Sequence, residues 1–371
     1  MACVAAVQSI LSEKKYADKV IEHALRTQRK WGARDRRAFA ETVYDIVRWR
    51  RLLAAQADSE EASALVAFYI AEKETFRSRA GGLPLAVRES FPDWLVARLT
   101  QETGLERASA LLQALNEPAP QFLRVNELKA RAQEAQARLL DEGIETIFVS
   151  DAALRLVKRQ NVFRSKAFQE GLVEMQDAGS QMIVPFLKPE PGELVIDACA
   201  GGGGKSLHLA ALMKNRGRVL SLDIYQWKLE ELKKRARRAG ASNIETRLID
   251  STKVIKRLEG KADRLLLDVP CSGTGVMRRN PDAKWKLTSD ELDRLGRLQL
   301  EILENYCPMV KPGGVIVYST CSVLPSENLS RVQEFVRRAN GAYQIETHWQ
   351  VSPIETQFDG FFACRLSRAL N

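Results

Sequence analysis

The sequence predicts an α/β fold with an open, doubly wound and mostly parallel sheet in the second half of the chain. Three observations predict it. Apolar runs typical of buried strands recur from Glu193 onward, each closes on small, polar or acidic residues, and segments with helical character separate them. In such a sheet the loops at the carboxyl ends of the strands form the ligand crevice. The residues that follow each strand are therefore the candidates for chemistry.

The first of these strands, Glu193–Ala200, leads into four consecutive glycines and then Lys205–Ser206, with a helix expected from near Leu207. Glycines let the backbone approach a ligand closely, and the helix amino terminus offers free amide hydrogens. The spacing is not that of a nucleotide phosphate loop, because position 199, where that loop requires glycine, is a cysteine. The turn alone does not identify the ligand, since glycine also serves close helix–strand packing.

The following strands each close on an acid. Gly217–Asp223 ends 22 residues after Gly201, Ile244–Ile249 is followed by Asp250, and a fourth strand ends at Asp268. An acid at the end of the second strand, here Asp223, can accept hydrogen bonds from the two hydroxyls of a ribose. Because the sequence lacks a conventional G-x-G-x-x-G fingerprint, a dinucleotide fits less well than S-adenosylmethionine, an adenosine-bearing cation without a pyrophosphate.

Two cysteines occupy matching positions after the fourth and fifth strands. Cys271 follows Asp268-Val-Pro, and Cys321 follows Ser319-Thr at the end of the run Gly314–Tyr318. Inert packing is the alternative, since most free cysteines behave as small hydrophobes. The six cysteines contain no C-x-x-C pair and the three histidines are scattered, so we expect no metal site, no disulfide framework and reduced thiols in a cytoplasmic protein.

Five segments together resemble the Nop/Sun-type RNA cytosine-C5 methyltransferases, a family that includes methyltransferases of bacterial small-subunit ribosomal RNA. The resemblance runs from about Leu123 to Arg368, and in one place, at Gly202, the chain departs from a proline that the family usually has. The five segments are Asp197–Lys205, Asp268–Gly275, Arg278–Trp285, Lys311–Gly314 and Tyr318–Asn328.

The resemblance implies a seven-stranded S-adenosylmethionine-dependent methyltransferase domain and a role for each site residue. It implies that Cys321 is the nucleophile, that Cys271 assists product release, and that Asp268 binds the edge of the base. The cofactor would be bound by Cys199, Ala200, Gly201, Gly202, Gly203, Gly204, Lys205, Asp223, Asp250 and Asp268. The substrate would be bound by Lys205, Pro270, Arg124 and Arg278.

The chemistry of cytosine explains why methylation of carbon 5 requires a thiol. Carbon 5 is too weak a nucleophile to attack a methyl sulfonium, and a thiolate that adds at carbon 6 activates it. Spacing does not decide which thiol attacks. In DNA cytosine methyltransferases the cysteine of the Pro-Cys pair attacks, so the assignment of Cys321 depends on the family resemblance.

Charge points toward an acidic partner. The chain has 56 Lys and Arg against 47 Asp and Glu, a formal net charge of +9. Arg26–Arg51 contains nine basic and three acidic residues, with Arg and Trp interleaved at Arg48–Arg51. Two interpretations are open for that segment: contact with RNA phosphates and bases, or a solvated helix whose Trp residues face inward. A second basic helix, Lys228–Arg238, is more typical of a solvated face.

The predicted organisation has three parts. Residues 1–117 show helical periodicity and are similar to the helical NusB-like domain often fused to this family. The boundary lies within the linker Glu117–Pro120, and residues 118–175 resemble a small RNA-recognition-like α/β module. Residues 176–371 form the methyltransferase domain. We expect no signal peptide, no membrane span and no RNA-binding domain after Phe362, and we expect a monomer.

The function that we expect is S-adenosylmethionine-dependent methylation of carbon 5 of cytosine, with ribosomal RNA as the expected substrate and a covalent cysteine adduct. Transfer RNA is the alternative substrate. An amino-methyltransferase would need no thiol and would carry a different motif after the fourth strand, where this chain has Asp268–Cys271. A non-catalytic RNA-binding assembly factor on the same fold is the third possibility.

Overall fold

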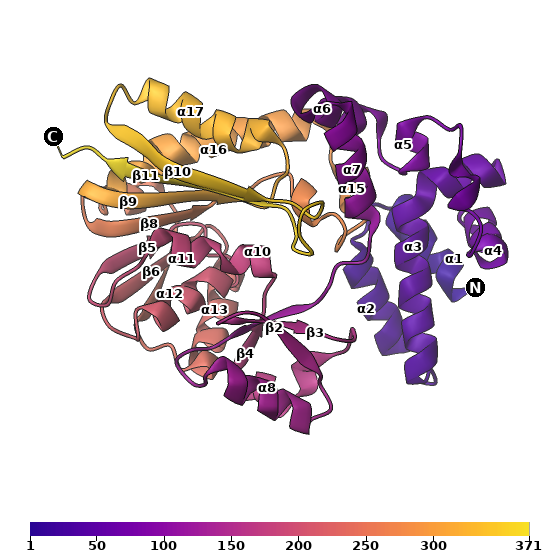
Figure 1. Cartoon of the computed structure of the whole chain (residues 1–371), viewed down its shortest axis with the longest axis horizontal. Coiled ribbons are helices and arrows are strands. Elements are labelled where there is room, and N and C mark those ends of the chain that lie inside the picture. The colour runs from indigo at the N-terminus through magenta and orange to yellow at the C-terminus, as the bar shows by residue number, and fades with distance from the viewer. Residues whose placement is uncertain (371) are drawn as a thin grey trace. The chain divides into compact units, whose positions relative to one another are not determined.

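The computed structural model describes residues 1–370, which form two compact units (Figure 1). Unit 1 contains Met1–Pro118 and Gly273–Leu292, and unit 2 contains Ala119–Ser272 and the chain from Asp293 onward. The division after Pro118 falls at the linker that the sequence predicts. The sequence gives no sign that Gly273–Leu292 returns to the first unit, or that the small module and the large sheet share the second.

Unit 1 is helical. On its third helix, Phe39, Val43, Ile46 and Val47 recur at intervals of three and four residues, and all four are buried in one core. The helices are α1 (Ala2–Leu11), α2 (Ala17–Thr27), α3 (Ala33–Ala57), α4 (Ala62–Glu72), α5 (Leu85–Arg88), α6 (Asp93–Thr103), α7 (Leu105–Asn116) and the short α15 (Ala283–Lys286).

Buried polar contacts join Gly273–Leu292 to the helices of unit 1. Lys284, which is 1% exposed, donates to Asn116 Oδ1 at 3.1 Å, and its ammonium lies 3.9 Å from the centre of the Phe91 ring. The Arg48 guanidinium donates to the carbonyl oxygen of Arg278 at 3.0 Å. These contacts are between residues far apart in sequence, which is why a linear division of the chain misses them.

A small antiparallel sheet opens unit 2, with strand order β2-β3-β1-β4. Leu123, Leu139 and Leu154 belong to its buried core, which lies under helix α8 (Ala132–Asp141). The structure confirms the small α/β module that the sequence predicts, and adds a fourth strand that the sequence does not show. Its strands are β1 (Phe122–Val125), β2 (Thr146–Ser150), β3 (Ala153–Leu156) and β4 (Val173–Met175), and α9 (Lys166–Gln169) precedes the last of them.

The larger sheet of unit 2 has seven strands in the order β10-β11-β9-β8-β5-β6-β7. Neighbours from β9 to β7 are parallel, whereas β11 is antiparallel to both β9 and β10. The chain builds outward from β5 to β7 and then returns to β8, so its direction reverses between β5 and β8, where ligands bind in such sheets. The strands are β5 (Leu194–Asp197), β6 (Arg218–Asp223), β7 (Ile244–Leu248), β8 (Ala262–Asp268), β9 (Val310–Thr320), β10 (Tyr343–Val351) and β11 (Phe361–Arg368).

Helices cover both faces of this sheet. In Figure 1, α16 and α17 lie over one face, and α11 and α12 lie over the other. Leu265, Leu266 and Leu267 of β8 are consecutive and fully buried, because a central parallel strand is covered on both sides. The structure thus confirms the doubly wound fold. The helices are α10 (Ala178–Gln181), α11 (Ile183–Leu187), α12 (Gly204–Leu212), α13 (Gln226–Ala239), α14 (Thr252–Lys256), α16 (Ser289–Tyr306) and α17 (Leu329–Arg338).

No helix within residues 1–370 is both long and apolar enough to cross a bilayer.

Candidate active site

The two cysteines that the sequence singles out lie side by side. Strands β8 and β9 are parallel neighbours with Asp268 opposite Ser319, so the loops that follow them leave the sheet at the same edge. The Sγ atoms of Cys271 and Cys321 are 3.4 Å apart, and both residues are half-buried and free of disulfides. The fold therefore brings together two thiols that are 50 residues apart in sequence.

A buried glutamate fixes the loop that carries Cys271. Glu327 is 1% exposed, and its Oε1 accepts from the backbone N–H of Ser272 at 2.8 Å and from Nε2 of Gln299 at 2.9 Å. Its Oε2 accepts from the Ser272 hydroxyl at 2.5 Å, and Gln299 also donates to the carbonyl oxygen of Pro270 at 3.0 Å. One buried acid thereby ties the loop after β8 to the chain after β9.

The loop that carries Cys321 is fixed by its own downstream residues. Asn328 accepts from the Thr320 hydroxyl at 2.5 Å and donates to the carbonyl oxygen of Ser322 at 3.0 Å. The Tyr318 hydroxyl donates to the carbonyl oxygen of Glu327 at 2.6 Å. Glu327, Asn328 and Gln299 are not among the site residues predicted from the sequence. The available signal was an acid and an amide next to each other, shortly after a strand-end motif.

Asp268 is held from both sides at the end of β8. Its Oδ2 lies 2.5 Å from Nζ of Lys205, and its Oδ1 accepts from the Ser319 hydroxyl at 3.1 Å. Lys205 is in the first turn of α12, directly after the glycine turn Gly201–Gly204. The structure therefore brings the glycine turn close to the two loops that carry Cys271 and Cys321, the thiol loops. The ion pair and the hydroxyl fix the orientation of this carboxylate.

The glycine turn closes a cavity of about 270 Å³ next to this ion pair. Gly203 has φ +86°, and a Cβ there would lie 2.4 Å from Cγ of Leu232, so only glycine fits. The cavity is lined by Met175, Gln176, Ser180, Asp197, Cys199, Ala200, Gly201, Gly202, Gly204, Lys205, Arg235 and Asp268.

Asp197 shows what kind of ligand suits the cavity. Its Oδ2 accepts from the Ser206 hydroxyl at 2.7 Å, but its Oδ1 is buried without a hydrogen-bond partner among residues 1–370. Burial raises the pKa of Asp197 to about 6, although the Ser206 bond opposes the shift. A ligand with a cationic amino group would pair with the unsatisfied oxygen. S-adenosylmethionine carries such a group, so this site fits the predicted cofactor. Asp197 is not among the cofactor ligands predicted from the sequence.

The other predicted cofactor residues differ in position. Asp223 is buried at the end of β6, where its Oδ2 accepts from the Gly201 N–H at 2.9 Å and its Oδ1 from the Tyr225 N–H at 2.8 Å. Asp250 is exposed after β7. Neither acid lines the cavity, so their predicted contacts with ribose and base stay predictions. Burial and the neighbouring carboxylates raise the pKa of the Cys199 thiol well above its usual value, which favours the uncharged thiol.

The predicted substrate residues are also divided. Pro270 is exposed beside the thiols. Arg124 is fully buried and donates to the carbonyl oxygen of Gly204 at 2.5 Å, and the substrate contact predicted for it stays a prediction. Burial lowers the pKa of Arg124 to about 10, and it still carries its charge at neutral pH. Arg278 belongs to unit 1 and is buried there, and its predicted substrate contact stays a prediction.

The segment Arg48–Arg51 is packed rather than presented to solvent. Arg48 and Trp49 are buried, Arg50 pairs with Glu60, and Arg51 donates to the carbonyl oxygen of Phe91 at 2.8 Å. The inward position of Trp49 agrees with the second interpretation that the sequence left open, whereas the arginines are paired within unit 1 rather than only solvated.

Among residues 1–370 no group of three or more His, Cys, Asp and Glu side chains is arranged to hold a metal ion.

Family models match two parts of the chain. The model described as 16S rRNA methyltransferase RsmB/F matches residues 184–367, which contain both thiols and the glycine turn. The model described as Methyltr_RsmF/B-like, ferredoxin-like domain matches residues 91–163.

Relatives named ribosomal RNA small subunit methyltransferase B match between 68% and 75% of the chain. A probable ribosomal RNA small subunit methyltransferase B from Bacillus subtilis is 39% identical over 256 residues, 68% of this chain and 57% of that protein. Ribosomal RNA small subunit methyltransferase B from Vibrio vulnificus is 34% identical, over 73% of this chain and 65% of that protein. The Shewanella oneidensis protein of the same name is 33% identical, over 75% of this chain and 67% of that protein. The chain thus spans between 57% and 67% of the length of these relatives.

Solved structures share the fold. The crystal structure of PH0851 has a TM-score of 0.84 and 24% identity, covering 99% of this chain and 98% of that one. A methyltransferase homolog protein from Pyrococcus horikoshii has a TM-score of 0.68 and 27% identity, covering 76% of this chain and 97% of that one. The comparisons confirm the predicted class of S-adenosylmethionine-dependent methyltransferase. The chain belongs to the RsmB/F family of 16S rRNA methyltransferases.

Proposed function

We propose that this chain is an S-adenosylmethionine-dependent RNA cytosine-C5 methyltransferase that acts on small-subunit ribosomal RNA through a covalent cysteine adduct. The observation that carries the proposal is the pair of thiols 3.4 Å apart, beside the Lys205–Asp268 ion pair and the cofactor cavity. The names of the relatives support ribosomal RNA as the substrate class.

Methylation of carbon 5 needs two different groups near the cytosine ring. Carbon 5 becomes a nucleophile only while another group is bonded to carbon 6. Its proton must then leave, which calls for a base close to carbon 5. A cysteine that is bonded to carbon 6 cannot also remove that proton. Two thiols within contact distance of each other meet both needs, whereas a chain that methylates an exocyclic amine needs neither.

In the proposed reaction the Cys321 thiolate forms a bond from sulfur to carbon 6, and the electron pair of the carbon 5–carbon 6 double bond becomes available at carbon 5. S-adenosylmethionine, when bound, would supply the methyl group to which carbon 5 bonds with this electron pair, and the bond from its sulfonium sulfur to that methyl group would break to leave S-adenosylhomocysteine. A base, which we assign to Cys271, then takes the carbon 5 proton. The electron pair from that C–H bond restores the double bond, and the sulfur–carbon 6 bond breaks to return Cys321 as a thiolate.

Asp268 is the group that we place at the N3 and amine edge of the cytosine. Lys205 and Ser319 hold its two oxygens, so the carboxylate is oriented before a substrate arrives. An oriented charge next to the ring stabilises the charge that develops there when the thiolate adds. Lys205 therefore acts at both ends of the site, through Asp268 on the base side and through the first turn of α12 on the cofactor side.

The cofactor would be held by the backbone of Gly201–Gly204 and by the unpaired oxygen of Asp197. Asp223 and Asp250 remain the predicted partners of its ribose and base. A Pyrococcus horikoshii structure titled NSun6 with SFG, an analogue of S-adenosylmethionine, has a TM-score of 0.70 to this chain and 20% identity, and covers 76% of this chain. That shared fold supports a cofactor of this type here.

The proposal is tested by incubating the purified chain with methyl-labelled S-adenosylmethionine and unmodified small-subunit ribosomal RNA, followed by bisulfite sequencing. We expect label in the RNA, a cytosine protected from bisulfite, and loss of both with Cys321→Ala. Transfer RNA in a parallel reaction tests the alternative substrate. Label without a protected cytosine would favour an amino-methyltransferase, and binding of both ligands without transfer would favour the assembly factor.

A further inference from the structure

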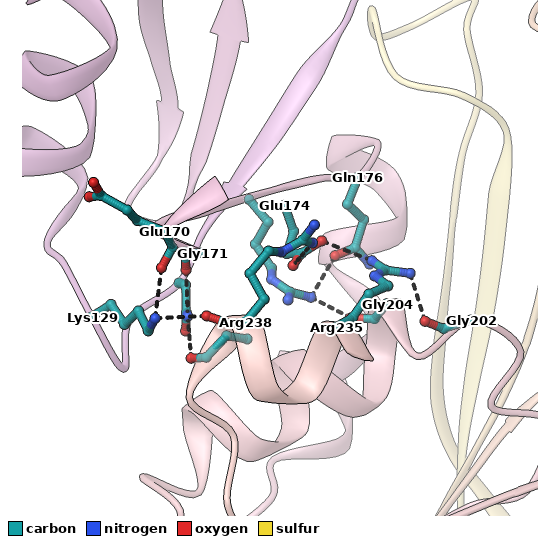
Figure 2. A network of polar contacts seen from close by, with 12 residues as sticks. Lys129, Glu170, Gly171, Glu174, Gln176, Gly202, Gly204, Arg235 and Arg238 are labelled. Carbon is teal, nitrogen blue, oxygen red and sulfur yellow. Dashed lines mark hydrogen bonds and ion pairs between the residues drawn. The ribbon is translucent and has the colours of Figure 1, made fainter. Parts of the chain in front are cut away.

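The four-glycine turn is held by side chains from outside the turn. A run of glycines has more conformational freedom to lose on folding than any other sequence, so a fixed shape here requires support. Two of the carbonyl oxygens of the turn accept hydrogen bonds from arginines, at Gly202 and at Gly204 (Figure 2). Both arginines belong to elements that do not adjoin the turn in sequence.

The first arginine is Arg235 on α13. Its Nη1 donates to the carbonyl oxygen of Gly202 at 2.7 Å, and its Nη2 donates to Oε2 of Glu174 at 3.0 Å. Glu174 is on β4 of the small sheet and is 2% exposed. A buried carboxylate is costly unless it is paired, so Glu174 fixes the guanidinium in one place. Figure 2 shows Arg235 between Glu174 and the glycine turn.

The second arginine comes from the same small sheet. Arg124 on β1 donates to the carbonyl oxygen of Gly204 at 2.5 Å and to Oε1 of Gln176, which follows β4, at 2.7 Å. Strands β1 and β4 are neighbours, with Arg124 opposite Glu174. One pair of residues in the small sheet therefore supports two carbonyl groups of the turn.

We propose that Arg235, anchored by Glu174, is a positioning residue that sets the shape of the cofactor turn, so that the small module takes part in cofactor binding. The proposal rests on the proposed function in one respect, that the cavity takes a ligand of the S-adenosylmethionine type. Arg235 also lines that cavity, as do Gln176 and Gly202. If the turn were flexible, part of the binding free energy would be lost to ordering it when the ligand binds, so the affinity would fall.

Two features of the chain make this role separable from ordinary packing. Arg238 pairs with the same Glu174 and stacks on Phe168 with 4.0 Å between its guanidinium and the ring centre, but makes no hydrogen bond to the glycine turn. It is the matched control. A Cβ at Gly202 would lie 3.3 Å from Nη1 of Arg235, so the guanidinium occupies the space beside that residue.

Gly202 also allows a rescue. Its φ is outside the left-handed region, and its amide donates no hydrogen bond among residues 1–370. Proline at this position would reduce the freedom of the turn without any arginine. Removal of the Arg235 side chain would make room for the proline ring. Gly202→Pro combined with Arg235→Ala should therefore regain what Arg235→Ala loses.

The experiment measures binding of S-adenosylhomocysteine by calorimetry and hydrogen exchange of residues 201–205 in the unliganded protein. We expect about tenfold weaker binding and faster exchange with Arg235→Ala, in line with loss of a charged hydrogen bond. Binding should stay within about twofold of the unsubstituted chain with Arg238→Ala, because that side chain does not touch the turn. The double variant Gly202→Pro, Arg235→Ala should recover most of the affinity.

Three outcomes are informative in different ways. Equal losses for Arg235→Ala and Arg238→Ala, or no loss in either, would overturn the proposal. Failure of the double variant to recover, with exchange still fast, would overturn it as well. If the unsubstituted chain does not bind S-adenosylhomocysteine at all, the proposed function is at fault, and hydrogen exchange of the turn in Arg235→Ala against Arg238→Ala still decides whether Arg235 positions it.

Discussion

The thiol loops and the glycine turn lie at the same edge of one sheet but are supported in different ways. The thiol loops are braced by residues that follow β9 or lie on α16, which covers the large sheet, above all by Glu327 and Gln299. The glycine turn is braced by Arg124 from the small sheet and by Arg235, which is anchored there. The part of the site that we assign to bond making is thus internal to the large sheet, whereas the part assigned to the cofactor depends on a second module.

The two buried acids in these networks illustrate the difference. Glu327 accepts from neutral donors, the amide and hydroxyl of Ser272 and the amide of Gln299. Glu174 accepts from two arginines. Glu327 thus joins parts of the large-sheet region to one another, whereas Glu174 joins the small sheet to α13. The two halves of the site should therefore fail independently when either acid is changed.

The largest effect is expected at Glu327. Glu327→Ala leaves buried donors without a partner, and should lower the free energy of unfolding by about 3–5 kcal/mol and reduce methyl transfer about a hundredfold. Glu327→Gln keeps the shape and one acceptor oxygen and should cost less. Denaturant unfolding and a methyl-transfer assay measure both. If Glu327→Ala instead weakened S-adenosylhomocysteine binding while transfer survived, the two halves would not be independent.

A smaller effect is expected at Asp223. Asp223→Ala removes the acceptor for the Gly201 amide and, in our proposal, for the ribose, so cofactor binding should weaken by roughly 1–3 kcal/mol. Asp250→Ala removes the other predicted cofactor partner and should cost less, because this acid is exposed and solvent screens its contacts. Calorimetry compares the two. Unchanged affinity with Asp223→Ala would remove this residue from the cofactor half of the site.

Lower pH should weaken cofactor binding, because it protonates Asp197. Because its pKa is raised to about 6, the charge that we pair with the cofactor amino group is lost as the pH falls through that value. S-adenosylhomocysteine affinity should fall about fivefold between pH 6 and pH 5, and approach about tenfold per pH unit only below that range. Asp197→Asn should bind more weakly and show no such dependence. A wild-type affinity that is flat across this range would contradict the pairing.

The same shift has the opposite sign for stability of the unliganded protein. The folded protein holds the Asp197 proton more tightly than the unfolded chain, whose aspartate pKa is about 3.9. The resulting stabilisation is full below that lower value and is lost as the pH rises through about 6. Denaturant unfolding of the unsubstituted chain against Asp197→Asn at several pH values isolates this contribution.

The smallest effect separates two parts of the basic segment of unit 1. Arg50 pairs with Glu60, so Arg50→Ala should cost under about 1 kcal/mol of stability and leave the salt dependence of RNA binding unchanged. Arg29 and Lys30 are exposed, and replacing either should reduce the log–log salt slope by about 0.7–0.9 if it contacts a phosphate. If the salt slope of all three variants equalled that of the unsubstituted chain, the segment would not be part of the RNA-binding surface.

Much of the fold could be predicted because the buried strands are continuous apolar runs. Leu265–Leu267 and Val315–Tyr318 are apolar runs that identify buried strands directly, and the cysteines that follow them are identified with them. Strand β4 could not be recognised, because Val173–Met175 is three residues long and contains the buried Glu174. Its place in the sheet is decided by pairing with β1 rather than by its own sequence.

Long-range polar pairs explain the rest of what the sequence did not show. Lys228–Arg238 has the composition of a solvated helix, yet Arg235 turns inward to Gly202 and Glu174. Arg48 is similar, since its charge is used inside unit 1. A basic residue looks the same in sequence whether its partner is water, a phosphate or a carbonyl group many positions away.

The separate roles of the two adjacent thiols are tested on a denaturing gel of the chain mixed with S-adenosylmethionine and unmodified small-subunit ribosomal RNA. Cys271→Ala should give a protein–RNA complex that survives denaturation, because attack at carbon 6 proceeds while breakdown of the adduct stalls. Cys321→Ala and the double variant should give none. An adduct trapped only by Cys321→Ala would exchange the two roles. Absence of an adduct in both single variants, with methyl transfer intact, would contradict the account.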